Sequence, residues 1–410
     1  MLRLYNTLTH KVEKFTPLRR GLVTYYTCGP SVYLQPHVGN FKTYVFEDVL
    51  RRWLEYKGLR VKHAMNITDV EDKGVRQAKG SRKKLLQQTR RNSKIFFHDA
   101  GRLKLLKPTV VCKATEHVPD MIKVIGKLMR RGYAYKWKED GNIYYDISKF
   151  RKYGKLSRTP VKKFAKVGRR VSKDDYWQFE MGDFALWKAR RPPDGDIFWR
   201  SPWGEGRPGW NIECSAMSMK YLGSTIDIHA GGSDLVFSHH ENEVAQSEGA
   251  TGKRFVNYWL HCRHLLINGK KMSKSLRNFY TISQLVAKGY SPRAIRYMLL
   301  SGHYRDRLNF TFKRLGKCER EVRELVKCHE MLKKYEKGKR SGKVAGIAGK
   351  AVIEFENAMD DDLNAPKALT AFFNLMCRAG ELARKRKMDR EETGAVLKAA
   401  AQMDSVLALL

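Results

Sequence analysis

The chain has 410 residues, enough for two or three domains, and 42% of them are hydrophobic, enough for a buried core. It has no run of about 18 apolar residues, so the sequence predicts no membrane-spanning helix and no membrane partner. The seven cysteines are scattered and odd in number, and the N-terminus lacks an apolar signal region. These features predict reduced thiols and a cytoplasmic location.

Basic residues dominate the charge of the chain. Lysine and arginine number 80 against 42 aspartates and glutamates, which gives a formal net charge of +38. Such a field attracts polyanions, and binding that releases counterions weakens steeply as salt rises. The charge therefore favours a nucleic-acid partner, with solubility alone as the alternative explanation.

The first elements in chain order predict a βαβ unit. Residues 22–27 form a candidate buried strand, and residues 38–57 repeat apolar side chains at three- and four-residue steps, as in a helix with Gly58 as its C-cap. Residues 61–67 form a second candidate strand. Open sheets built from such units bind ligands at the carboxyl ends of their strands. The glycine-rich dinucleotide fingerprint is missing, so the unit does not predict NAD.

A long basic segment interrupts this pattern from about residue 105 to residue 200, with aromatic residues between its lysines and arginines. Its densest basic run is residues 162–170, and an exposed linker is the alternative explanation. The sheet is expected to resume with strands at residues 210–214 and 225–228. The first of these strands would end at Cys214.

Helices dominate the rest of the chain. Residues 314–337 predict a charged amphipathic helix, and residues 338–349 predict a loose basic connection. Two or three further helices follow, one of them starting within residues 360–366. The predicted fold class is α/β, with a Rossmann-like parallel-sheet domain that carries an inserted domain and is followed by an α-helical bundle.

Two short motifs indicate ATP chemistry when they are taken together. Pro36-His37-Val38-Gly39-Asn40 follows the first strand and begins a helix, whose free N–H groups and positive dipole end suit phosphates. Lys271-Met272-Ser273-Lys274-Ser275 forms a short loop with two lysines, which suit the charge of departing pyrophosphate. Either motif alone is common on protein surfaces, but the two in this order are a specific combination.

Further motifs accompany this pair: Thr27-Cys28-Gly29-Pro30-Ser31-Val32-Tyr33, Asn66-Ile67-Thr68-Asp69, Trp210-Asn211-Ile212-Glu213-Cys214 and His239-His240-Glu241-Asn242-Glu243. From about residue 20 to the C-terminus, the chain resembles the cysteinyl-tRNA synthetases, which are class I aminoacyl-tRNA synthetases. The resemblance implies ATP-dependent activation of L-cysteine to cysteinyl-adenylate and its transfer to the 3′ end of cysteine tRNA. It also implies a monomer that uses ATP with Mg²⁺ in the cytoplasm.

The resemblance divides the chain into five parts. They are the first half of the catalytic domain (1–104), a connective-peptide insertion near the tRNA acceptor end (105–200), the second half of the catalytic domain (201–262), the KMSKS loop with a stem-contact region (263–313) and a tRNA-binding helical bundle (314–410).

Four residues have the chemistry of a zinc shell: Cys28, Cys214, His239 and Glu243. His239 and Glu243 are four residues apart, so on a helix they share a face, and the two cysteines are expected at strand ends. Thiolates and imidazole select zinc over magnesium. Spacing alone leaves open that the cysteines are core residues. The resemblance implies one Zn²⁺ per chain, which takes the substrate thiol as an additional ligand and so rejects serine without an editing domain.

The resemblance also assigns residues to the two substrates. The ATP-binding residues are His37, Gly39, Asn40, Gly231, Gly232, Asp234, Lys271 and Lys274, and the cysteine-binding residues are Thr68, Trp210 and His229. His37 and Lys274 are the predicted catalytic residues, which act by positioning and charge stabilisation. Asn40 stands where the family usually has a second histidine, and it keeps a donor without a charge. Thr68, Trp210 and His229 have ordinary structural explanations as well.

The chain departs from the family pattern in two places. The family usually carries a small anticodon-recognition domain after the helical bundle, and this chain stops about where that domain would begin. The chain is therefore expected to be either a truncated sequence or a natural short form that lacks this domain. Arg277 stands where a glycine is usual. Two alternatives remain, a cysteine ligase acting on an amino sugar as in mycothiol synthesis and a non-catalytic RNA-binding paralogue. The net charge disfavours the first, and the intact motifs disfavour the second.

Overall fold

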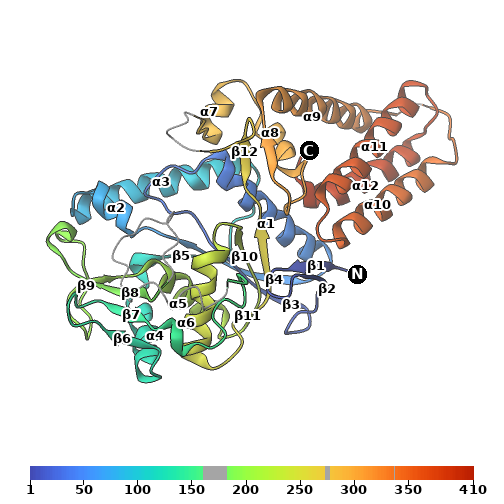
Figure 1. The fold of residues 1–410 in the computed structure, drawn as a ribbon. Coiled ribbons are helices and arrows are strands. Elements are labelled where there is room, and N and C mark those ends of the chain that lie inside the picture. The colour runs from blue at the N-terminus through green and yellow to red at the C-terminus, as the bar shows by residue number, and fades with distance from the viewer. Residues whose placement is uncertain (160–181, 273–277, 337) are drawn as a thin grey trace.

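The computed structural model describes residues 1–159, 182–272, 278–336 and 338–410. At its centre lies a five-stranded parallel sheet (Figure 1), with the spatial order β11 (Val256–Cys262), β10 (Ile226–Gly232), β3 (Leu22–Thr27), β4 (Arg60–Ile67) and β5 (Val110–Lys113). The strand order reverses between β3 and β10, which makes this a doubly wound sheet. Ligands bind such sheets beyond the carboxyl ends of the strands, at the point of reversal.

Helix α1 (Val38–Tyr56) connects β3 to β4, so the predicted βαβ unit is confirmed. Its three- and four-residue apolar repeat is buried in the core, with Phe41, Val45 and Val49 each at most 2% exposed. Lys57 caps its C-terminus, and Gly58 follows in the left-handed region at φ 80°. Glycine is favoured there because it has no Cβ atom.

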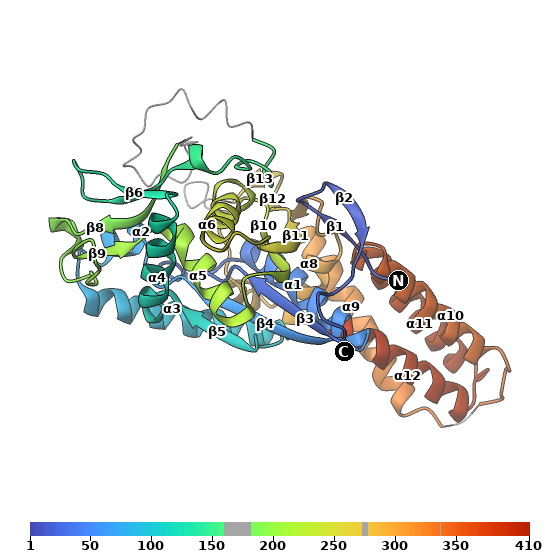
Figure 2. The same cartoon turned by 90° about the horizontal axis from the view of Figure 1, so that it is seen from below.

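Helices cover both faces of the parallel sheet (Figures 1 and 2). Helix α1 contacts β4 and β10, whereas α5 (Trp210–Leu222) contacts β3 and β4 and belongs to a separate hydrophobic cluster. The remaining helices of this domain are α2 (Asp72–Gln77), α3 (Arg82–Arg102), η1 (Ala114–Glu116), α4 (Val118–Arg130), η5 (Val236–His240) and α6 (Glu241–Thr251). Helices α4, α5 and α6 pack against one another, which gives the sheet its second helical layer.

The strand predicted at residues 210–214 is wrong, because these residues form the first turns of α5. Residues 212–218 are all buried, so this part of the helix has no solvent-exposed face and shows no helical period in the sequence. A short buried run of this kind cannot be assigned to strand or helix from periodicity. Cys214 therefore lies in a helix and not at a strand end. The strand predicted at residues 225–228 is confirmed as the start of β10.

The inserted region forms a four-stranded antiparallel sheet (Figure 1). Its strands, in spatial order, are β6 (Ala134–Lys136), β7 (Ile143–Tyr145), β8 (Phe184–Ala189) and β9 (Gly206–Pro208), with short helices η2 (Ile147–Lys149) and η4 (Pro192–Asp194). Strand β5 lies within the segment predicted as insertion but pairs with β4, and β9 lies beyond its predicted end. The prediction rested on charge density, which carries no information on strand pairing. The basic run at residues 162–170 lies outside the described residues.

The C-terminal helices form a bundle on one side of the sheet domain (Figures 1 and 2). They are α9 (Phe312–Lys333), α10 (Val344–Asp360), α11 (Ala365–Arg384) and α12 (Arg390–Leu407), after α7 (Ile282–Ala287) and α8 (Pro292–Leu300). The smaller sheets are β1 (Arg3–Asn6) with β2 (Lys11–Lys14), and β13 (Lys270–Lys271) with β12 (Leu265–Ile267) and β14 (Leu308–Phe310).

The predicted bundle is confirmed, although two of its boundaries differ. The helix predicted over residues 314–337 ends at Lys333, and α10 begins at Val344, inside the predicted loose connection. Glycines at positions 346 and 349 weaken the helical signal there. Among the described residues, the structure contains no helix that is both long enough and apolar enough to cross a bilayer.

Asp48 of α1 joins the sheet domain to the bundle. Its Oδ2 accepts hydrogen bonds from Arg52 at 2.8 Å and from Arg296 of α8 at 2.6 Å. The Arg296 side chain is 1% exposed and also donates to the carbonyl oxygens of Leu103 and Leu407, at 2.9 and 2.6 Å. A buried guanidinium requires such partners, because transfer of an unpaired charge out of water is costly.

We expect Asp48→Ala to destabilise the protein by about 3–5 kcal/mol, because it leaves Arg296 as a buried cation without its carboxylate. Urea unfolding measures this change. Glu55→Ala is the matched control on the same helix, since Glu55 pairs with Arg51 at the surface and is 37% exposed. The control should cost less than about 1 kcal/mol. An equal loss of unfolding free energy in the two variants would contradict a stabilising role of the buried Asp48–Arg296 pair.

Candidate functional site

Four buried side chains meet beyond the carboxyl ends of β3 and β10. Cys28 directly follows β3, Cys214 lies on α5, His239 lies in η5 and Glu243 lies on α6. Each of these residues is at most 8% exposed, and their ligand atoms all lie within 4.8 Å of one another. The structure thus brings together the four residues of the predicted zinc shell, which come from segments up to 215 residues apart.

The distances in this cluster suit one small cation. Cys28 Sγ lies 3.7 Å from Cys214 Sγ and 3.9 Å from Glu243 Oε1. His239 Nε2 lies 3.4 Å from Cys214 Sγ and 3.1 Å from Glu243 Oε1. A tetrahedral zinc with Zn–S bonds of about 2.3 Å separates two sulfur ligands by about 3.8 Å. Two thiols, one imidazole and one carboxylate are donors that zinc accepts, so the cluster fits this ion.

The same four side chains show strong electrostatic coupling. Burial would raise the pKa of Cys214, but hydrogen bonds with Cys28 and His239 lower it to about 6. Burial would lower the pKa of His239, but Cys214 and Glu243 raise it to about 10. A thiolate and a carboxylate therefore share one positive charge on the imidazole. A divalent cation meets the same electrostatic demand, because it replaces that proton.

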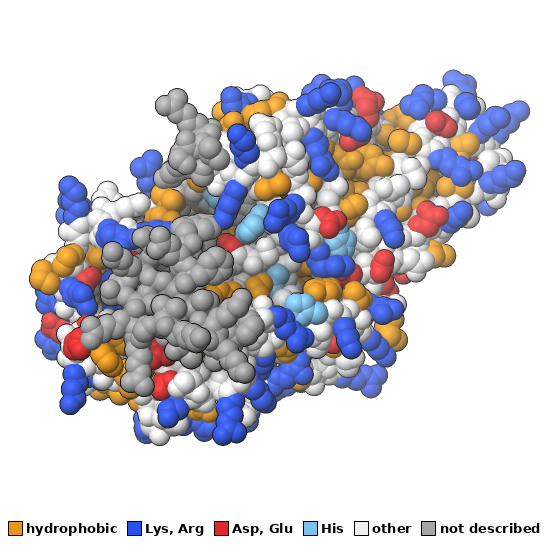
Figure 3. All heavy atoms as spheres, viewed as in Figure 1, with side chains coloured by type: hydrophobic (Ala, Val, Ile, Leu, Met, Phe, Trp, Pro, Cys, Tyr) orange, Lys and Arg blue, Asp and Glu red, His pale blue; other side chains and the backbone are white. Residues whose placement is uncertain are grey.

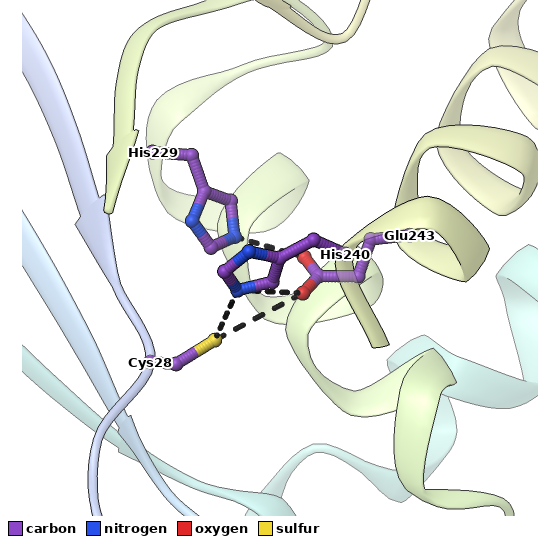
Figure 4. Close-up of side chains that lie close together, drawn as sticks. All are labelled: Cys28, His229, His240 and Glu243. Atoms are coloured by element: carbon purple, nitrogen blue, oxygen red, sulfur yellow. Dashed lines mark hydrogen bonds and ion pairs between the residues drawn. The ribbon is translucent and has the colours of Figure 1, made fainter. Parts of the chain in front are cut away.

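A second group of possible ligands shares two members with the first (Figure 4). It consists of Cys28, His229, His240 and Glu243. His240 Nε2 lies 3.3 Å from Cys28 Sγ and 3.9 Å from Glu243 Oε1, and His229 Nε2 lies 3.0 Å from Glu243 Oε2. This group has one thiol instead of two, so the first group is the softer set and the better match to zinc.

Sequence reasoning missed the support that surrounds the cluster. His240 Nδ1 lies 2.7 Å from His261 Nε2, and His261 Nδ1 lies 2.7 Å from the hydroxyl of Thr7. The rings of His229 and His240 lie 4.5 and 5.0 Å from Trp259. Partners of this kind fix the rotamers and tautomers of residues near a metal. The only sequence signal was the His239-His240 pair, which does not reveal which histidine faces the cluster.

The predicted cysteine-binding residues surround the same cluster. The ring of Trp210 lies 4.0 Å from the ring of His239, centroid to centroid. Thr68 follows β4, and its hydroxyl donates to Glu213 Oε2 at 3.0 Å. His229 lies in β10 and contacts Glu243 as described above. All three residues are therefore near the cluster. His229 directly contacts Glu243, one of the predicted zinc ligands.

The predicted ATP-binding motif forms the N-terminus of α1. His37 is its N-cap, and a reciprocal pair of bonds joins it to Asn40: Asn40 N donates to His37 Nδ1 at 3.2 Å, and His37 N donates to Asn40 Oδ1 at 3.0 Å. Burial lowers the pKa of His37 to about 4, so the ring is neutral at pH 7. Because Nδ1 accepts, the ring proton lies on Nε2, where it is a donor for a phosphate oxygen.

The second predicted ATP motif returns to this helix terminus. A Cβ atom placed on Gly39 would lie 3.3 Å from Met272 Cε, and Val38 N donates to Tyr280 O at 2.9 Å. Lys271 is exposed in β13. Lys274 and Arg277 lie outside the described residues. The structure therefore brings Met272, in the described start of the second motif, and Tyr280, which follows the motif, to the first motif.

The remaining predicted nucleotide residues end β10. A Cβ atom on Gly231 would lie 2.9 Å from His240 Cε1, so only glycine fits between the strand end and the cluster. Gly232 is the last residue of the strand. Asp234 follows with a side chain that is 51% exposed, 4.0 Å from His264.

Comparisons with known proteins identify the family of this chain. Residues 14–320 match the family model of the tRNA synthetases class I (C) catalytic domain, and residues 354–410 match the DALR domain. The chain is 42% identical to the cysteine–tRNA ligase of Koribacter versatilis (strain Ellin345) over 413 aligned residues, which cover 100% of this chain and 82% of the relative. It is 40% identical to that of Protochlamydia amoebophila (strain UWE25), covering 100% and 86%.

Solved structures share the fold at low identity. Mycobacterium tuberculosis methionyl-tRNA synthetase in complex with methionyl-adenylate aligns with a TM-score of 0.64 at 14% identity, covering 95% of this chain and 90% of that one. The Agrobacterium radiobacter K84 agnB2 LeuRS–tRNA–LeuAMS complex aligns with a TM-score of 0.68 at 11% identity, covering 97% and 85%. The fold is that of the class I tRNA synthetases. Within this class, the chain belongs to the cysteine–tRNA ligase family.

We expect Cys214→Ser to weaken zinc binding by more than about 100-fold, because a hydroxyl replaces a thiolate ligand. Elemental analysis of the purified protein measures the metal content. Cys112→Ser is the matched control, since Cys112 is equally buried but lies on β5 with its sulfur 3.5 Å from Met65 O. Full zinc occupancy in the Cys214→Ser variant would show that Cys214 is not a zinc ligand.

Proposed function

We propose that the protein activates L-cysteine with ATP and transfers it to the 3′ end of cysteine tRNA. The observation that carries this proposal is the cluster of Cys28, Cys214, His239 and Glu243 at the sheet edge where α1 begins. A thiol-binding centre and a phosphate-binding helix terminus at one edge suit a substrate that has both a thiol and a carboxylate to be activated.

The proposed reaction has two steps. An oxygen of the cysteine carboxylate attacks the α-phosphorus of ATP, the bond from that phosphorus to the bridging oxygen breaks, and pyrophosphate leaves with the bonding electrons. A terminal ribose hydroxyl of the tRNA then attacks the carbonyl carbon of cysteinyl-adenylate, loses its proton, and AMP leaves. Neither step requires a covalent bond to the protein, so catalysis rests on positioning and on charge stabilisation.

The residues at the start of α1 supply part of that stabilisation. The Nε2–H group of His37 and the backbone N–H of Gly39 are the proposed donors for phosphate oxygens, since Val38 N and Asn40 N already donate to Tyr280 and His37. Gly39 lets the phosphates approach the backbone closely, and Asn40 keeps its amide N–H groups as donors after Oδ1 is used in the cap. Gly231, Gly232 and Asp234 would contact the nucleotide from the end of β10. Lys271 and Lys274 would neutralise the departing pyrophosphate, with Mg²⁺ bound to ATP.

The cluster would provide substrate selection. Cys28, Cys214, His239 and Glu243 would hold Zn²⁺, which when bound supplies a soft Lewis acid for the substrate thiol and a far poorer partner for a serine hydroxyl. Trp210 contacts the ring of His239 and closes one side of this region. The buried position of the cluster excludes water, which would otherwise compete for the metal.

The surface charge supports the RNA part of the proposal. Lys and Arg side chains outnumber Asp and Glu over the bundle and the rim of the sheet domain on the face in Figure 3. Helix α9 alone exposes Lys313, Lys317, Arg320, Arg323 and Lys327. A chain of net charge +38 will release counterions when it binds a tRNA, so its affinity should fall steeply with salt. We further propose that the enzyme acts as a cytoplasmic monomer.

The zinc-loaded protein should exchange labelled pyrophosphate into ATP when cysteine is present and should charge cysteine tRNA. With serine, kcat/KM should fall by about 10⁴-fold or more, because the hydroxyl cannot satisfy a site built for a thiolate. The Cys112→Ser protein controls for general effects of a lost thiol.

Two outcomes would contradict the proposal. Comparable pyrophosphate exchange with serine and with cysteine would show that the thiol-binding centre does not select the substrate. Adenylate formation followed by transfer to an amino sugar, with no charging of tRNA, would favour the alternative ligase.

A further inference from the structure

A buried carboxylate at a corner of the bundle binds two other parts of the chain. Asp362 lies between α10 and α11 and is 3% exposed. Its Oδ1 accepts hydrogen bonds from Tyr5 N at 2.7 Å and from the Tyr304 hydroxyl at 2.6 Å, and its Oδ2 accepts one from Arg305 Nε at 2.6 Å. The donors belong to β1 and to the segment between α8 and β14, so this one side chain joins the bundle to both.

The backbone of this corner has an unusual conformation. Asp362 and Leu363 have φ values of 54° and 55°, in the left-handed region that residues with a Cβ atom rarely adopt. Two further bonds hold the corner: Asp362 N donates to Arg3 O at 3.1 Å, and His303 Nε2 donates to Asp362 O at 3.0 Å. A strained conformation persists only where its surroundings over-determine it, and such positions are concentrated at functional sites.

The segment of residues 303–306, which Asp362 holds, also contacts the start of α1. Lys42 lies near the N-terminus of this helix and is 2% exposed. Its Nζ donates to Arg263 O at 2.6 Å and to Asp306 O at 2.7 Å. Arg263 N in turn donates to Tyr304 O at 2.8 Å. A buried ammonium needs such acceptors, so the position of the segment and the position of the helix start are fixed to each other.

The same segment leads into the small sheet that carries Lys271. Strand β14 begins at Leu308, which lies opposite Leu265 of β12. The next residue of β12, Leu266, lies opposite Lys271 of β13. A continuous series of hydrogen-bonded backbone elements therefore runs from the segment that Asp362 holds to this lysine. The start of α1 and Lys271 are the two described places to which phosphate binding is assigned around the nucleotide, and both are connected to Asp362.

We propose that Asp362 is a positioning residue for adenylate formation, an inference that rests on the proposed function. By holding residues 303–306, it would fix Lys271 and the start of α1 so that both meet the same triphosphate. Catalysis by positioning loses rate steeply when reacting groups are displaced by about 1 Å. The metal cluster contains none of these residues. Loss of the Asp362 contacts should therefore slow the chemical step and leave the binding of cysteine unchanged.

Asp362→Asn is the test variant. In either orientation, its amide places an NH₂ group against a donor, Arg305 Nε or Tyr5 N, so one bond of the corner must break. In pyrophosphate exchange with the zinc-loaded protein, kcat should fall by about 10-fold or more, and the KM of cysteine should change by less than about twofold.

Tyr304→Phe is a second variant, which removes one donor to Asp362 and keeps the ring. It should lower kcat in the same direction, and it decides the question if Asp362→Asn does not fold. In the double variant the two effects should be less than additive, because both act through one carboxylate.

Asp389→Ala is the matched control in the bundle, since Asp389 caps α12 and its Oδ1 accepts from Glu392 N at 2.8 Å. It should lower stability and leave kcat within about twofold. An unchanged kcat in the folded Asp362→Asn and Tyr304→Phe proteins would overturn the inference, and so would an equal fall in the control. A raised KM of cysteine at constant kcat would do the same. Failure of the wild-type protein to form the adenylate would instead overturn the proposed function.

Discussion

The fully buried carboxylate of Glu243 is the constraint on which the site depends. Burial alone would raise the pKa of this group, but His229 and His239 lower it below its ordinary value, so the side chain is a buried anion. An anion without access to water needs positive or donating partners. Its two oxygens meet His239 from η5 and His229 from β10, and Cys28 approaches from the end of β3. Segments far apart in the chain are thereby held at one point.

Helix α1 connects this point to the rest of the molecule. Its first turn carries the donors proposed for ATP, and its third turn carries Asp48, which binds the buried Arg296 of α8. Arg296 in turn donates to the last residue of α12. One rigid helix therefore ties the proposed nucleotide site to the bundle. These buried contacts set the position of α1 relative to the bundle.

Much of this architecture was accessible from the sequence, because its elements carry local signals. The apolar repeat of residues 38–57 and the strands on either side of it were predicted, and the four predicted metal ligands do lie together. Helix α5 was missed because its residues 212–218 are all buried, so this part shows no alternation between exposed and buried positions. The contacts of His240 and His261 beside the metal cluster could not be predicted, since they join distant segments of the chain. The residue types were enough to predict the metal ligands. The contacts that hold these ligands in place could be identified only from the structure.

The most direct test of this account is zinc X-ray absorption spectroscopy of the purified protein, with and without cysteine. A zinc ion held by Cys28, Cys214, His239 and Glu243 should show a first shell of two sulfur and two nitrogen or oxygen scatterers, with the sulfur distance near 2.3 Å. Addition of cysteine should raise the sulfur count to three, and addition of serine should leave it at two. A shell with one sulfur, or a sulfur count that cysteine does not change, would contradict the claim that this cluster selects the substrate.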